Sequence, residues 1–194
     1  MATNTLTELY VEKLKDLYSA EQQILKALPK MVKAATHAEL QNAFETHRRQ
    51  TETHVQRLDQ IFEELGKSPH GKACAGVKGI IEEGAELMKE DPEPNVLDAG
   101  LISGAQGVEH YEMAGYGSVR TWADQLGYAE QAELLQQTLD EERQTDKLLT
   151  ELAEQSVNLD AEIALSAEDE RLADMPRKRS PGKRATGTKH PRPS

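Results

Sequence analysis

Apolar residues recur at intervals of three and four along four long stretches of the chain, and this spacing predicts four amphipathic α-helices. The expected helices span about residues 5–35, 39–65, 95–126 and 129–156. A shorter helix is expected at about 77–89, inside the connection between the second and third of them. Pro29 is expected to bend the first helix, because its ring nitrogen has no hydrogen to donate. Gly66 and Gly127 are expected to end the second and third helices, and Asn95 to cap the third.

The lengths of the connections predict how the helices are arranged. Tight turns join the first helix to the second and the third to the fourth, so each pair is expected to form an antiparallel hairpin. The middle connection is long enough to cross the whole bundle, and one long crossover is typical of ferritin-like bundles. We therefore predict an all-α, ferritin-like four-helix bundle over residues 1–160, with a short helix in its crossover.

Charge is divided unevenly along the chain. The formal net charge is −11, yet residues 177–194 hold seven lysines and arginines and no acid. Residues 161–194 are expected to form a flexible C-terminal tail, basic from residue 176, because Pro, Gly, Lys and Arg dominate its last part. Such a tail can bind nucleic-acid phosphates without sequence preference, or it can be a solvated extension with no partner. Both interpretations stay open.

Composition narrows the classes of function. The single cysteine, Cys74, excludes an internal disulfide framework and a Cys-rich zinc site. No apolar run approaches the roughly 18 residues of a membrane span, and the N-terminus has no secretory pattern. A cytoplasmic protein without membrane contact is expected. No phosphate-binding loop and no Gly-x-Ser-x-Gly motif is present, so the sequence does not support the corresponding enzyme classes.

Polar residues interrupt the apolar stripe of every long helix. The four that fall at one depth are Glu21, His54, Glu109 and Glu142. In each hairpin the two members are 33 residues apart and lie sixteen or seventeen residues from the turn. At a rise of about 1.5 Å per residue, all four lie about 25 Å from a turn, so they are expected to meet in one layer of the core.

A buried layer with three carboxylates and an imidazole needs compensation, because unpaired buried charges cost several kcal/mol each. Divalent cations supply it, and these ligand types suit iron, manganese or zinc. Glu112 and Asp146 are further candidate ligands one turn away, while His47 is expected to be a hydrogen-bonded neighbour. Three flanking residues are expected to face solvent: Glu52, His110 and Glu141. A hydrogen-bonded polar layer without metal is the alternative.

Four segments resemble the YciF-type family of bacterial ferritin-like proteins. They are YVEKLKDLYSAEQQILKALPKM, HVQRLDQIFEELG, VEHYEMAGYG and LQQTLDEERQTDKLL, one from each long helix, within a resemblance that covers about residues 4–157. It implies a dimeric ferritin-like bundle, a link to stress responses and a dinuclear metal centre. By position, the family's inward polar residues correspond to Glu21, His54, Glu109 and Glu142, and also to Glu112 and Asp146.

Two departures from related proteins bear on the metal. Gln50 stands where members of the family often have glutamate, which removes one formal charge. The Glu-x-x-His pattern of ferritin-like sites is absent, because Arg57 follows His54 by three residues and Thr145 follows Glu142 by three. The centre is therefore expected to be atypical.

Two functions are compatible with these features. The first is a ferritin-like stress protein with a carboxylate-bridged di-metal centre, best suited to iron, that handles iron or peroxide. An enzymatic activity of the oxidase or ferroxidase type stays open, because ferroxidase, peroxide-consuming and oxygenase activities share one ligand chemistry. The second is a non-enzymatic dimeric scaffold whose buried polar layer is structural. Both predict a homodimer, and the first predicts metal ions as partners.

Overall fold

The computed structural model describes residues 3–163, which are almost entirely helical. The helices are α1 (Leu6–Ala34), α2 (Ala38–Leu65), α3 (Ala75–Glu90), α4 (Pro94–Gln125) and α5 (Ala129–Leu152). A π-helical segment, Ala153–Val157, follows α5, and α-helix continues over residues 158–163. Of the predicted C-terminal tail, residues 161–194, only 161–163 are described, and they are helical; its basic part from residue 176 lies outside the described residues.

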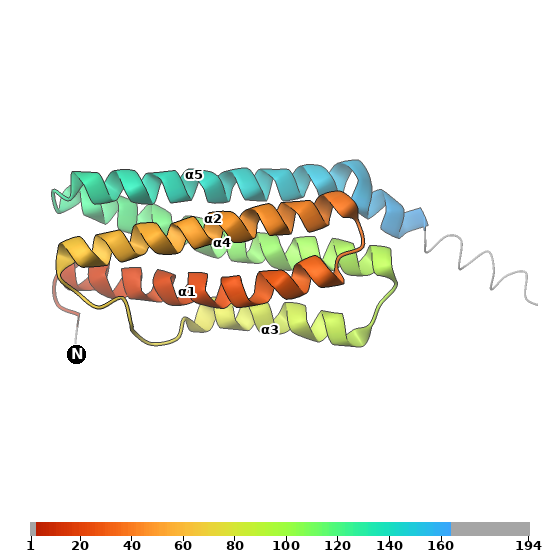
Figure 1. Cartoon of the computed structure of the whole chain (residues 1–194), viewed down its shortest axis with the longest axis horizontal. Coiled ribbons are helices and arrows are strands. Elements are labelled where there is room, and N and C mark those ends of the chain that lie inside the picture. Colours follow the sequence, from red (N-terminus) through yellow and green to blue (C-terminus); the bar gives the residue numbers. More distant parts are fainter. Residues whose placement is uncertain (1–2, 164–194) are drawn as a thin grey trace, which may run out of the picture.

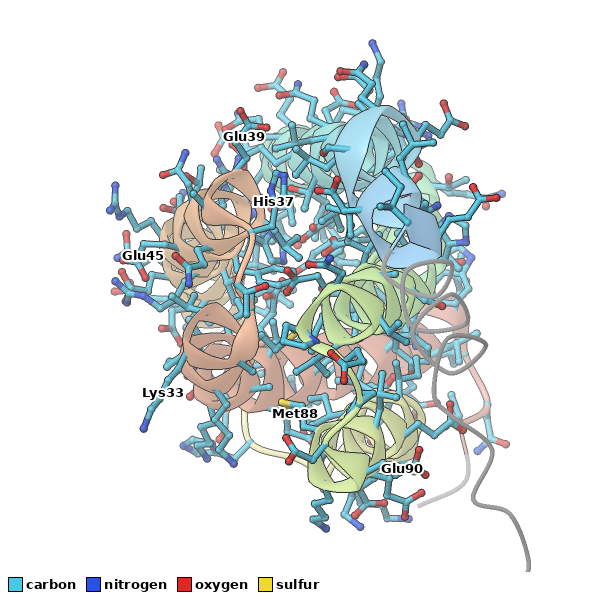
Figure 2. The ribbon with its side chains drawn as sticks, turned by 90° about the vertical axis from the view of Figure 1, so that its right-hand side faces the viewer. Lys33, His37, Glu39, Glu45, Met88 and Glu90 are labelled. Atoms are coloured by element: carbon cyan, nitrogen blue, oxygen red, sulfur yellow. The ribbon has the colours of Figure 1, made fainter. Side chains whose placement is uncertain are left out.

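The long helices form an antiparallel four-helix bundle. Helices α1 and α2 pack as one hairpin and α4 and α5 as the other, while α1 also contacts α4 and α2 contacts α5 (Figure 1). Helix α3 is carried by the long connection and lies outside the bundle against α1 and α4, as the view along the bundle shows near Met88 and Glu90 (Figure 2). The prediction of an all-α bundle with one crossover is confirmed.

The predicted helix ends are correct to within a few residues. Thr5 and Glu8 form a capping box at the start of α1, and Gly66 and Gly127 end their helices with φ of 61° and 80°. One prediction is wrong, because Asn95 does not cap α4. Glu93 is the N-cap residue and Pro94 is the first helical residue, a position at which its missing N–H has no partner to lose. Helix α1 continues past Pro29.

Asp98 of α4 fastens the turn between α1 and α2. Its carboxylate accepts hydrogen bonds from the backbone N–H of Thr36 at 2.9 Å, the Thr36 hydroxyl at 2.7 Å and the backbone N–H of His37 at 2.8 Å. His37 makes no side-chain cap of its own, so Asp98 supplies the acceptor and the negative charge at the start of α2. The two hairpins are thereby held in register.

The core consists of two apolar clusters with a polar layer between them. One cluster lies toward the α1–α2 turn and includes Ile24, Phe44 and Leu149. The other lies toward the opposite end and includes Leu14, Phe62 and Leu135. Because apolar side chains pack on both sides of the polar layer, water has little access to it. Among the described helices, none is long and apolar enough to cross a membrane.

Candidate metal centre

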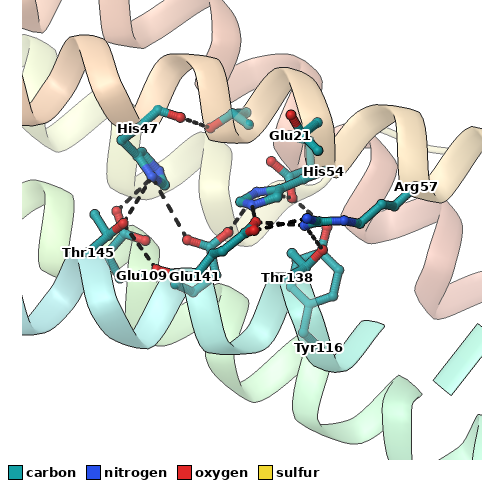
Figure 3. Close-up of polar contacts among 12 residues, drawn as sticks. Glu21, His47, His54, Arg57, Glu109, Tyr116, Thr138, Glu141 and Thr145 are labelled. Atoms are coloured by element: carbon teal, nitrogen blue, oxygen red, sulfur yellow. Dashed lines mark hydrogen bonds and ion pairs between the residues drawn. The ribbon is translucent and has the colours of Figure 1, made fainter. Parts of the chain in front are cut away.

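Glu21, His54, Glu109 and Glu142, one from each bundle helix, meet in the layer between the two clusters (Figure 3). Each side chain is buried, with at most 1% of its surface exposed. Nδ1 of His54 lies 2.9 Å from Glu142 Oε1 and 3.5 Å from Glu21 Oε1. The equal depth expected from the hairpin spacing therefore brings these side chains together.

A second group of polar atoms adjoins the first. His47 Nε2 lies 3.3 Å from Glu109 Oε1, and His47 Nδ1 lies 4.0 Å from Glu142 Oε2. Glu112 completes this group and is wholly buried. In each group the candidate ligand atoms lie within 4.8 Å of one another, and Glu142 belongs to both. Each of the two groups could therefore hold a cation, with Glu142 common to both.

Many oxygens and nitrogens in this layer have no hydrogen-bond partner within residues 3–163. They comprise one carboxylate oxygen each of Glu21 and Glu109, both oxygens of Glu112 and of Glu142, and the inward nitrogens of His47 and His54. The 2.9 Å contact between His54 and Glu142 is close but does not have hydrogen-bond geometry. Buried polar atoms in folded proteins are normally satisfied, and a group of unpaired oxygens and nitrogens such as this one could hold a metal ion.

The outer nitrogen of His54 is held by a carboxylate. Nε2 lies 2.8 Å from Glu141 Oε2, and Arg57 donates to both oxygens of the same carboxylate at 2.6 and 2.9 Å. In the neutral imidazole, with Nε2–H donating to Glu141, the lone pair is on Nδ1, which faces Glu21 and Glu142. Carboxylates hold metal-binding histidines in this way, fixing the tautomer and raising the basicity of the ring.

His47 is oriented by a hydroxyl. Thr145 Oγ1 donates to the carbonyl of Glu141 at 3.2 Å and lies 3.4 Å from His47 Nδ1. Because the threonine proton is used, Nδ1–H of His47 is the donor in that pair and its lone pair is on Nε2, which faces Glu109. When neutral, both imidazoles thus direct lone pairs toward carboxylates, an arrangement that a proton or a metal ion between them would stabilise.

Tyr116 adds one more contact at this layer. Its hydroxyl donates to Glu21 Oε1 through a short hydrogen bond, and its ring is wholly buried beside His54. Burial, followed by the charges of Glu21 and Glu112, raises the pKa of Tyr116 well above its usual value. The phenol therefore keeps its proton and holds Glu21 in place.

The pKa values of the acids and imidazoles in this layer are shifted in different directions. Burial raises the pKa of Glu109 well above its usual value, with Glu142 adding to the effect, and burial does the same at Glu112, with Glu21 adding to it. Burial also opposes a charge on His54, but Glu21 and the contacts with Glu141 and Glu142 outweigh it and raise its pKa to about 12.

At Glu142 burial is likewise outweighed by both histidines, so its pKa falls to about 2. Protons on His54, Glu109 and Glu112 therefore supply part of the positive charge that a metal would bring.

The remaining candidates lie at the edge of the layer or outside it. Asp146 is half-buried, accepts from Gln106 Nε2 at 3.1 Å and faces the exposed His110 at 3.2 Å, so it belongs to neither group. Glu52 and His110 face solvent, as expected. The expectation of a solvated Glu141 is wrong, because Arg57 and His54 draw its carboxylate inward.

The sequence predicts His47 to be a hydrogen-bonded neighbour of the centre. In the structure its imidazole lies closer than that, among the candidate ligands themselves. Its signal in the sequence is its position two turns before His54, on the same face of α2. Gln50, three residues after His47 on α2, is half-buried. Both imidazoles thus come from α2, whereas the Glu-x-x-His pattern takes one from each of two helices.

Comparisons with known proteins agree with this architecture. Residues 5–162 match the family described as domain of unknown function DUF892. Protein YciF of Escherichia coli (strain K12) is 41% identical over 163 residues, which is 84% of this chain and 98% of the relative. The crystal structure of the E. coli stress protein YciF matches with a TM-score of 0.77 over 80% of this chain and 99% of that one.

YcfI of Rhodopseudomonas palustris matches at 40% identity with a TM-score of 0.74, over 76% of this chain and 94% of that one. A Xanthomonas campestris protein of 20% identity shares the fold, with a TM-score of 0.63 over 86% of this chain and 99% of its own. The predicted relationship is confirmed: the chain belongs to the DUF892 family, which includes the stress protein YciF.

Proposed function

We propose that the chain binds two divalent metal ions in the bundle core, bridged by Glu142. His47, Glu109 and Glu112 would hold the first ion, and Glu21 and His54 the second. Charge supports this assignment, since four carboxylates and two neutral imidazoles balance two divalent ions. The spacing also supports it, because the candidate ligand atoms of each group lie within 4.8 Å of one another.

The donor set favours iron. Carboxylate and imidazole donors suit iron, manganese and zinc alike, and bundle cores with four carboxylates and two imidazoles are characteristic of di-iron proteins. Bound iron would supply ferroxidase-type or peroxide-consuming chemistry. The chain's own part is to exclude water with its two apolar clusters, to orient His54 through Glu141, and to hold the Tyr116 proton against Glu21. Asp146 is not needed for this set.

The biological role that fits best is an iron- or peroxide-handling function during stress, in a cytoplasmic homodimer. It rests on the relative that is described as a stress protein. A structural polar layer in a non-enzymatic scaffold is the weaker alternative, because a structural network leaves few buried atoms without partners. Here both oxygens of Glu112 and of Glu142 lack them within the described residues.

Metal analysis tests the proposal directly. Full-length protein from cells grown with added iron or manganese should carry about two equivalents per chain by elemental analysis. Glu142→Ala removes the shared ligand and should reduce the content to below one. Glu133→Ala changes an exposed glutamate of the same helix and should leave it unchanged. Metal-free protein that takes up neither ion on reconstitution would refute the di-metal centre and favour the scaffold.

A further inference from the structure

An apolar cavity of about 270 Å³, open to solvent on one side, lies between α3 and the bundle and is lined by α1, α3 and α4. Its walls include Ala27 and Met31 of α1, Ile80 and Ile81 of α3, and Ala105 and Val108 of α4. Figure 2 places Met88 at the same interface, between α3 and α1. Apolar walls give water few partners, so the cavity suits a hydrocarbon better than ordered solvent.

A smaller cavity of about 30 Å³ leads from this space toward the polar layer. The two cavities share five wall residues, among them Met31, Ile81 and Val108. The inner one is also lined by His47, Glu109 and Thr145. The inner cavity therefore adjoins the outer one and reaches the His47 side of the polar layer.

The solvent side of the outer cavity is positively charged. The charged residues of its lining are Lys26, Lys30, Lys78 and Glu82, and all four are exposed. Lys78 pairs with Glu82 at 2.8 Å, whereas Lys26 and Lys30 form no ion pair with any residue in 3–163. Residues 3–163 contain 15 basic and 30 acidic side chains, so a lining with three lysines and one glutamate is opposite in sign to the described part of the chain as a whole.

We propose that this cavity binds a small amphipathic monoanion, a carboxylate on an unbranched apolar chain. Its head group lies at Lys26 and Lys30, and its chain enters the cavity toward His47. The positive charge of the lysines at the opening argues against two other occupants of the cavity. The chain's own basic tail would be repelled by the lysines, and a second copy of this face would bring like charges together.

Two variants alter the cavity without changing any candidate metal ligand. Gly104 lines the cavity, and a Cβ added there meets nothing within 4 Å, so Gly104→Leu extends a side chain into the space and also raises helix propensity. Gly117→Leu is the matched control, on the same helix with equally open surroundings and outside the cavity. Lys26→Glu with Lys30→Glu reverses the charge at the opening, and Lys67→Glu is its control.

Isothermal titration calorimetry with decanoate, below its micellar concentration, tests the proposal on full-length protein as purified and after chelation. We expect one decanoate per chain in both states and no saturable binding of decyltrimethylammonium. Gly104→Leu should weaken decanoate binding by about tenfold or more, and the lysine reversals by about threefold, while both control variants bind normally.

Absence of saturable decanoate binding, or equal binding by Gly104→Leu, would overturn the assignment. Equal binding of the cation, or indifference to the lysine reversals, would overturn the anionic head group. Loss of self-association in Gly104→Leu without decanoate binding by the parent would identify a protein partner instead. Metal content, measured on the same samples, should not change, so failure here is distinguishable from failure of the metal centre.

Discussion

His54 and Glu141 are held together across the α2–α5 interface, with Nε2 of the imidazole 2.8 Å from Oε2 of the carboxylate. Arg57 donates to both oxygens of that carboxylate, and these contacts lower the pKa of Glu141 to about 2, with the Arg57 hydrogen bond the largest cause. Glu141 is therefore a charged acceptor at neutral pH. Its position fixes which nitrogen of His54 faces the layer.

Removing this charge should weaken metal binding without unfolding the protein. Glu141→Gln keeps an acceptor for His54 but lowers the basicity of the ring, and losses of this kind are about 10–100-fold in metal affinity. Competition with a chelator of known affinity measures the change. Glu133→Gln, on the exposed face of α5, is the control. Equal affinity in the two variants would show that Glu141 is only a surface partner of Arg57.

A substitution of Glu112 can show whether this carboxyl group serves metal binding or the stability of the fold. It is wholly buried and neither carboxylate oxygen has a hydrogen-bond partner in residues 3–163. Glu112→Met replaces it with an apolar side chain of similar size, which should stabilise the metal-free protein by about 1–4 kcal/mol. The same change should remove most of the stabilisation that metal gives. Denaturant unfolding with and without chelator measures both.

A loss of metal-free stability in Glu112→Met would contradict this interpretation. It would show that the carboxylic acid makes contacts that the protein needs without a cation. Glu83→Met, an exposed position on α3, controls for the general effect of adding an apolar side chain.

The stability of metal-free protein should depend on pH in a defined direction. The pKa of His54 is raised from 6.5 to about 12, and those of Glu109 and Glu112 are raised above 4.5. The folded protein then binds these protons more tightly than the unfolded chain, so stability falls as pH rises above about 5 to 7. Glu141 and Glu142, whose pKa values are about 2, act oppositely and lose their contribution as pH falls below about 4.5.

A bound metal should reverse the fall in stability with rising pH at neutral and alkaline pH. Its ligands must give up their protons, so affinity rises with pH. The gain in melting temperature on adding metal should therefore be larger at pH 8 than at pH 5.5. Calorimetric melting with metal or with chelator measures it. Metal-free protein that melts higher at pH 8 than at pH 5.5 would contradict the assigned protonation.

The bundle and the four converging residues could be predicted because both depend on spacing along single helices. Apolar periodicity located the helices, and the shared separation of 33 residues placed Glu21 level with His54 and Glu109 level with Glu142. Each is a regular property of hairpins whose helices rise at a constant rate. Side-chain direction near the edge of the layer is less regular, and there the predictions failed.

Glu141 and Asp146 show what the periodicity of a single helix does not predict. A four-residue spacing from Glu142 suggested that Asp146 points inward, yet its carboxylate pairs with Gln106 and His110 at the bundle edge. Glu141 lies beside Glu142 and was expected in solvent, but Arg57 from another helix turns it toward His54. Both outcomes depend on partners from other helices, which one helix's periodicity does not contain.

Among the polar residues outside the polar layer, Asp98 should be one of those whose substitution destabilises the protein most. Three hydrogen bonds from Thr36 and His37 converge on its buried carboxylate at the start of α2. Asp98→Ala removes the acceptor, and partial rescue by water at the exposed Thr36 limits the loss to about 2–3 kcal/mol. Asp98→Asn should lose less, because the amide oxygen still accepts while its NH₂ faces one of the donors. Chemical denaturation followed by circular dichroism measures the free energy of unfolding.

The matched control is Asp124→Ala, an exposed aspartate on the same helix that faces Arg120 at 3.6 Å. Surface pairs of this kind contribute about 0–1 kcal/mol, so the two alanine variants should differ by roughly 2 kcal/mol. Metal content should be the same in both, because Asp98 lies on α4 about three turns before Glu109. Equal stability of the two variants would show that the α1–α2 turn holds its place without α4.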